Sequence, residues 1–223
     1  MDVQTTGGSN NDGIKLTLSK SSVAQTLVAT LGDLSAAGEG DVTIIGADTI
    51  KQVAGQLIQA DHLDIEVGLI DVDPSLNIKV NSLRLNATGS ANGISINHTG
   101  DKRLLVTEMI LENGGLLINS ENDIDLEMLQ LYDAKLGADD ILLTVNADGH
   151  IKIGDVRVGT FEDSPAVAGS ALSVQGNAKL TAGRSITQLH SDAKVDLVAD
   201  KLELKACEEV ADGDACVGII GFE

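Results

Sequence analysis

The sequence predicts an all-β protein folded as a right-handed parallel β-helix (β-solenoid), with a β-sandwich as the alternative. Similar phrases recur in the same order, because D-T-I-K-Q at 48–52 and A-D-H-L-D-I at 60–65 are followed later by R-S-I-T-Q at 184–188 and A-D-K-L-E-L at 199–204. Internal repeats of this kind are typical of stacked arrays. Aromatic residues make up only 1% of the chain, which has no Trp, 1 Tyr and 2 Phe. A sandwich core normally contains more large rings, whereas narrow stacked coils are filled by aliphatic side chains.

The individual strands are predicted by alternation of apolar and polar residues, since successive side chains of a strand point to opposite faces. In the clearest run, Leu83 and Leu85 face one way and Arg84 the other. Gly, Asn or Asp ends most runs, as tight turns require. The other runs are Ile14/Leu16/Leu18, Ile65/Val67, Ile94/Ile96, Ile124/Leu126/Met128, Val145/Ala147, Ile151/Ile153, Val156/Val158, Val195/Leu197 and Leu202/Leu204. We expect five leucines to be buried in aliphatic stacks, namely Leu63, Leu83, Leu85, Leu202 and Leu204.

Residues 14–223 are predicted to form one solenoid domain, and the polar residues 1–13 a flexible linker or an added N-terminal stretch. Within this domain, residues 22–31 could instead form a short capping helix, because Val23, Leu27 and Leu31 have helix-like spacing and Ser22 could begin a capping box. Residues 126–136 are similarly ambiguous between strand and helix.

The chain is strongly acidic, with 34 Asp and Glu against 15 Lys and Arg and a net charge of −19. A charge of this sign repels phosphate backbones, so nucleic acid is not an expected partner. The sequence also has no run of about 20 apolar residues, so no membrane insertion is expected. We interpret the acidity as a means of keeping an extracellular rod soluble, with calcium capture by acidic turns as the alternative.

The two cysteines, Cys207 and Cys216, are separated by eight residues that include Gly213. A disulfide between them would close the loop 207–216 and would indicate an oxidising compartment. Two unpaired thiols are the alternative.

Residues that could carry chemistry are few. Asp139/Asp140 and Asp212/Asp214 are weak candidates for Ca²⁺ ligands, because Ca²⁺ needs six or more oxygens and ordinary solvated turns explain these pairs equally well. No other cofactor is expected. His62, His98 and His150 fall at outward or turn positions by alternation, and no metal-hydrolase spacing or nucleophile elbow is present. We therefore expect no enzyme, with a β-helical polysaccharide lyase or hydrolase as a remote alternative.

Three phrases resemble the repeat regions of giant exported bacterial surface proteins, the filamentous-haemagglutinin-like large exoproteins and repetitive adhesins. They are A-D-x-L-x-L at Ala60–Ile65, L-x-x-x-V-x-x-L-x-L-x-A at Leu76–Ala87 and G-I-x-I-x-x-T-G at Gly93–Gly100. The resemblance implies a parallel β-helix at the bacterial cell surface or outside the cell, serving as a fibre, stalk or adhesive surface. It carries over no functional residues.

These observations predict a structural segment of an exported fibre or adhesin, with a glycan- or protein-binding adhesion module as the alternative. Its partners would be copies of itself, the rest of a longer parent chain, or a glycan or surface protein. The ends of an array expose strand edges. Head-to-tail stacking is therefore expected to join Ile219, Ile220 and Phe222 at one end to Ile14, Leu16 and Leu18 at the other.

Overall fold

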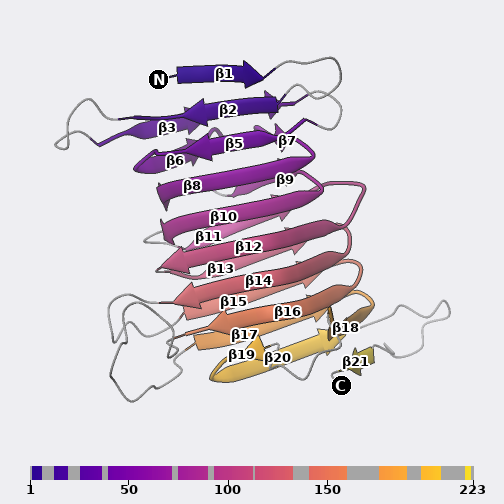
Figure 1. The fold of residues 1–223 in the computed structure, drawn as a ribbon. Helices are drawn as coiled ribbons and strands as arrows, with labels where there is room; N and C mark the ends of the chain where they lie inside the picture. The colour runs from indigo at the N-terminus through magenta and orange to yellow at the C-terminus, as the bar shows by residue number, and fades with distance from the viewer. Residues whose placement is uncertain are drawn as a thin grey trace.

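The computed structural model is a β-solenoid of about six turns and confirms the predicted fold class (Figure 1). It describes residues 2–6, 13–19, 26–36, 40–71, 75–89, 93–112, 114–132, 141–159, 176–189, 197–206 and 219–221. Every regular element in these ranges is a strand. Strands of successive coils pair in parallel, and the one antiparallel pair among them joins the first two strands. A sandwich of antiparallel hairpins is therefore excluded for the described residues.

The strands form two sheets. Sheet A has 13 strands: β1 (Asp2–Thr6), β2 (Gly13–Thr17), β3 (Val28–Leu31), β5 (Val42–Ile45), β6 (Thr49–Gln52), β8 (His62–Ile70), β10 (Ser82–Gly89), β12 (Leu104–Glu112), β14 (Ile124–Tyr132), β16 (Ile151–Val158), β18 (Ser185–Gln188), β19 (Leu197–Val198) and β21 (Ile219–Gly221). Sheet B has eight strands: β4 (Leu34–Ser35), β7 (Ile58–Gln59), β9 (Leu76–Lys79), β11 (Ile94–His98), β13 (Leu116–Ser120), β15 (Ile141–Ala147), β17 (Gly176–Ala182) and β20 (Lys201–Ala206).

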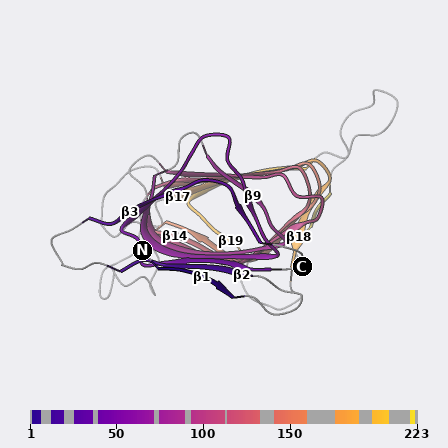
Figure 2. The ribbon, with the colours of Figure 1, turned by 90° about the horizontal axis from the view of Figure 1, so that it is seen from above.

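From β8 to β18 the chain alternates strand by strand between the two sheets, so each coil lies directly on the one before it. Seen down the stacking axis, the coils superpose around one closed outline (Figure 2). The spacing between paired residues of neighbouring coils is 20 residues at His62 and Ser82 and 35 at His150 and Ser185. The length of the repeat therefore varies from coil to coil, although equivalent strands still pair in parallel.

The core consists of aliphatic columns that run along the axis. One column passes through Ile44, Ile65, Leu85, Met109, Leu129 and Val156, each paired with the next and each 0% exposed. Leu63, Leu83 and Leu85 are fully buried, as predicted. The prediction is wrong for Leu202, which is 49% exposed, and Leu204 is only half-buried. Both belong to β20, the edge strand of sheet B, where no described strand of a following coil covers them.

In the long strands β12 and β14 of sheet A, the alternation of inward and outward side chains shifts by one residue part-way along the strand. In β12 the register shifts because Thr107 is inserted opposite the step from Leu83 to Arg84. The neighbouring strand β14 shows the same change, since Leu126 and Leu129 are both buried while Met128 between them is half-buried. The expectation that Met128 shares the inward face of Leu126 is therefore wrong, because a bulge places two consecutive residues outward.

The capping helix expected over residues 22–31 is not formed in its described part. Residues 28–31 form strand β3, which pairs in parallel with β6 from Val28↔Thr49 to Leu31↔Gln52. The β-branched Val28 and Thr30 suit this extended backbone, and residues 22–25 lie outside the described residues. The ambiguous segment 126–136 is strand as far as Tyr132, and its remainder is not described.

The N-terminal residues differ from the expected linker. Asp2–Thr6 form β1, which pairs antiparallel with β2 in the register Asp2↔Thr17 to Thr6↔Gly13. This strand covers the edge of β2 that would otherwise end sheet A, and it lies at the N-terminal end of the stack in Figure 1.

Substitution of two glycines with positive φ would test how closely the backbones of neighbouring coils approach. Gly46 and Gly55 both have positive φ, at 88° and 79°. A Cβ at Gly46 would collide with the carbonyl oxygen of Leu18 in the preceding coil, whereas a Cβ at Gly55 would meet nothing within 4 Å. We expect Gly55→Ala to lower the free energy of unfolding by about 1 kcal/mol through backbone strain alone. Gly46→Ala should cost roughly 1–3 kcal/mol more through overpacking. Urea unfolding measures both, and equal losses would contradict this account.

Candidate functional site

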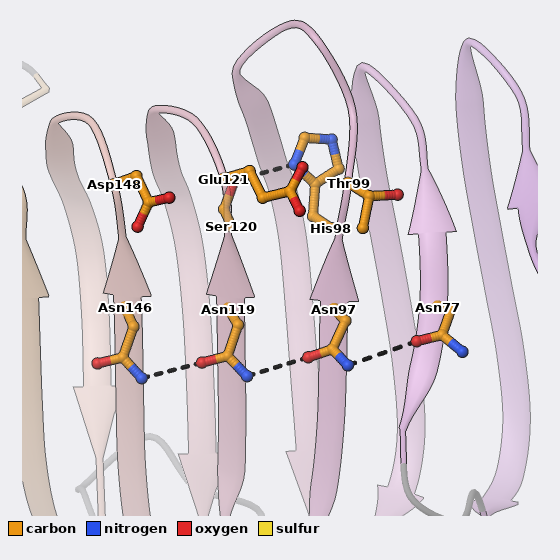
Figure 3. Close-up of a pocket in the computed structure, with 9 residues that line it drawn as sticks. All are labelled: Asn77, Asn97, His98, Thr99, Asn119, Ser120, Glu121, Asn146 and Asp148. Atoms are coloured by element: carbon orange, nitrogen blue, oxygen red, sulfur yellow. Dashed lines mark hydrogen bonds between the residues drawn. The ribbon is translucent and has the colours of Figure 1, made fainter. Parts of the chain in front are cut away.

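An asparagine ladder crosses the outer face of sheet B. Its members occupy the same position in four successive strands, and the side-chain amides are joined in a row (Figure 3). Asn146 Nδ2 donates to Asn119 Oδ1 over 2.9 Å, Asn119 Nδ2 donates to Asn97 Oδ1 over 3.0 Å, and Asn97 Nδ2 lies 3.4 Å from Asn77 Oδ1. The parallel in-register pairing brings these residues together, since it places equivalent positions of neighbouring coils side by side.

A shallow groove of about 350 Å³ lies beside this ladder, at the carboxyl ends of β9, β11, β13 and β15. We call it the amide groove. It is lined by Asn77, Asn97, His98, Thr99, Asn119, Ser120, Glu121, Asn146 and Asp148. Thr99, Glu121 and Asp148 follow directly after their strands and lie along one side in Figure 3. The groove thus presents a row of four amides beside two carboxylates and a threonine hydroxyl, which can hydrogen-bond hydroxyl groups of a ligand. Its lining has no aromatic platform of the kind that sugars stack on.

His98 differs from its predicted outward position. The alternation within β11 turns it inward between two coils, where it is 1% exposed. Its Nε2–H donates to the carbonyl oxygen of Val80 over 2.9 Å, and its Nδ1 accepts from the Ser120 hydroxyl over 2.9 Å. Burial lowers the pKa of His98 below its ordinary 6.5, against smaller opposing effects of the Val80 hydrogen bond and the Glu121 charge. A neutral imidazole therefore fits this position, since a buried cation would be costly.

All three histidines of the described residues bond to a serine of the next coil. Each contact joins imidazole Nδ1 to a serine hydroxyl, at 2.7, 2.9 and 2.6 Å for His62–Ser82, His98–Ser120 and His150–Ser185. Only the central pair adjoins the amide groove. Because the same contact recurs on the outer surface and in the core, we interpret it as a link between coils rather than as a catalytic dyad.

An ionic ladder lies on the outer face of sheet A. Arg84 of β10 contacts Asp64 of β8 at 3.0 Å and Glu108 of β12 at 3.0 Å, so one cation joins three consecutive coils. Its hydrogen bond to Asp64 raises the pKa of Arg84, and burial opposes that effect. Arg103 covers Asp125 in a similar way, with Nη1 at 2.8 Å from a carboxylate that is 4% exposed. These contacts reduce the repulsion that the acidic excess creates within the stack.

The predicted site residues are only partly described. Cys207, Cys216, Asp139, Asp140, Asp212, Asp214 and Phe222 lie outside the described residues. Ile219 and Ile220 are in β21, whose backbone pairs with β18. Leu16 and Leu18 are buried, at 4% and 6% exposure, and Ile14 is half-buried. The strand that carries Ile14 and Leu16 is covered by β1, so the structure does not place these residues on an open N-terminal edge.

Among the described strands, β20 forms the C-terminal edge of sheet B, and sequence reasoning did not single it out. Its inward residues Leu202, Leu204 and Ala206 pair with buried Ala178, Leu180 and Ala182 of β17 and continue their columns. The phrase L-E-L of β20 has the same pattern as the buried L-D-I of β8, so nothing in the local sequence marks it as an end. Only its place in the stack exposes it.

Within the ranges that the structure describes, no group of three or more His, Cys, Asp or Glu side chains is arranged to hold a metal ion. In the same ranges no helix is long and apolar enough to cross a membrane. Comparison of the chain with protein-family models, with curated proteins and with solved structures finds no match.

Proposed function

We propose that this chain is a structural and interaction segment of an exported bacterial fibre or adhesin. The observation that carries the proposal is the redundancy of links between coils. Backbone pairing, aliphatic columns, the asparagine ladder and the ionic ladder of Arg84 all run along the same axis. Such an array is a stiff body whose stability accumulates from contacts between neighbours.

The distribution of polar groups supports this role. Asn97, Asn119 and Arg84, which carry the outer ladders, are satisfied largely by residues of adjacent coils. The net charge of −19 keeps the body soluble at high local concentration. The resemblance of Ala60–Ile65 and Leu76–Ala87 to exoprotein repeats favours a location at the cell surface or outside the cell. The amide groove would be the basis of a glycan-binding role, but it is shallow and its amides are already bonded to each other, so we place the structural role first.

The proposal is tested by whether the chain is accessible on the outside of intact cells. Intact cells of the producing bacterium would be treated with a protease that does not enter them, and the chain would be followed with an antibody. We expect the chain to be shaved from intact cells, and its deletion to remove surface fibres or cell attachment. A cytoplasmic protein of the same cells is the control for lysis. Protection of the chain in intact cells and release only on lysis would contradict an exported fibre or adhesin.

A further inference from the structure

At the C-terminal end of sheet B, no further described strand covers the last apolar layer of the core. β20 pairs on one side with β17, and among the described residues no strand pairs with its other side. Leu202 is 49% exposed, while its partner Ala178 in the preceding coil is 2% exposed. An apolar column that ends in an exposed leucine, at an edge with which no described strand pairs, is a template for one more strand.

The N-terminal end of another copy does not fit this edge. Sheet B begins there with β4, which has 2 residues against the 6 of β20. Sheet A begins there with the antiparallel strand β1, which already covers β2. Among the described end strands of sheet B, the one that matches β20 in length is β20 of a second copy. Two identical strands related by a two-fold axis pair in antiparallel orientation.

The sequence K-L-E-L-K-A at 201–206 selects one register for this pairing. Three registers near the strand centre, centred on Leu202, Glu203 or Leu204, keep inward residues opposite inward residues. Shifting one strand by a single residue would place inward residues opposite outward ones. Centring on Leu202 puts Asp200 opposite Leu204 in the apolar column. Centring on Glu203 puts that carboxylate opposite itself.

Centring on Leu204 satisfies both faces of the strand. On the inner face, Leu204 meets Leu204 of the second copy, and Leu202 meets Ala206 of that copy. On the outer face, Glu203 meets Lys205 of the second copy, and the two-fold axis repeats this opposite-charge pair. Opposite charges directly across an antiparallel pair are stabilising, and like charges are destabilising.

We propose that two copies of this chain associate tail to tail through antiparallel β20–β20 pairing centred on Leu204, joining their two B sheets into one. The inference rests on the proposed function, for which it names the partner and the end that binds it. A two-fold contact of this kind is closed, so it gives a dimer rather than an open filament. Repulsion between two chains of charge −19 opposes association, and added salt should therefore strengthen it.

A charge-complementation experiment tests the register. Glu203→Lys places like charges at both cross-strand pairs of the dimer, and so does Lys205→Glu. Sedimentation equilibrium of each variant alone should show a dimer dissociation constant raised at least about tenfold. An equimolar mixture should regain dimers, because each copy of one variant then faces the opposite charge on the other. The 2.9 Å ion pair of Lys179 with Glu203 within one chain is lost in E203K both alone and in the mixture, so recovery reports only on the contact between copies.

The possible outcomes distinguish a tail-to-tail dimer from a monomer and from open-ended assemblies. A wild-type chain that stays monomeric at all salt concentrations overturns the proposal, as does a dimer that neither variant weakens or that mixing does not restore. Assemblies that lengthen with concentration would instead show head-to-tail contacts. Circular dichroism of both variants checks that the solenoid is intact. Since these measurements use purified protein, their failure leaves the cell-surface result unaffected, and the two proposals fail independently.

Discussion

Replacing Leu85 with alanine is expected to lower the free energy of unfolding by about 2–5 kcal/mol. Leu85 is 0% exposed and lies in the middle of an aliphatic column, between Ile65 and Met109. The cavity would be bounded by strands on both sides, whose backbones are fixed by parallel pairing. They can collapse only partly into the space, so both the transfer free energy and the packing contacts are lost.

The matched control is Leu202→Ala, which removes the same atoms from an inward position of β20, the edge strand of sheet B. Because Leu202 is 49% exposed at the edge strand, its loss should cost well under half as much in the monomer. Chemical unfolding at a concentration that excludes association measures both. Equal losses would mean that the end of the stack is covered, and would contradict the open edge at β20.

Acid should destabilise the solenoid through His98, and the sign follows from its lowered pKa. Since the folded-state pKa lies below the ordinary 6.5, the unfolded chain binds more protons at pH values between the two. The contribution of His98 to stability is therefore complete above pH 6.5 and is lost as pH falls below that value. For one proton the slope is at most about 1.4 kcal/mol per pH unit.

The measurement is the free energy of unfolding of wild type and His98→Gln against pH. The carboxylates titrate in both proteins, so the difference between the two curves isolates the histidine. A Gln side chain keeps one donor and one acceptor for Val80 and Ser120. His62→Gln, which alters a serine contact on the outer surface, controls for the loss of a His–Ser bond. A difference curve for His98 that is flat below pH 6.5 would contradict the prediction.

Several features could be predicted only coarsely from the sequence. Alternation identified Leu83, Leu85 and Arg84 with the correct faces, because period-two burial is a local property of a strand. It misplaced Met128 after the bulge, since an inserted residue reverses the faces without changing the composition. It also misplaced His98, whose neighbour Asn97 takes the outward position instead. A polar side chain in the core is tolerated only where specific partners lie in the adjacent coils.

The sequence by itself determined the fold class and most of the solenoid interior, because repeated alternating phrases and the scarcity of aromatic residues favour stacked coils over a sandwich. The tertiary structure alone decided which equivalent positions meet. The ladder of Asn97 and Asn119, the His98–Ser120 contact and the ion pair of Arg84 with Asp64 join residues at least 20 positions apart. The lengths of the connecting segments decide which residues of neighbouring coils become partners. Because these lengths are unequal, no local sequence pattern predicts the pairing. The exposure of Leu202 likewise follows from its place at the end of a stack, since a repeated phrase is buried only where another coil covers it.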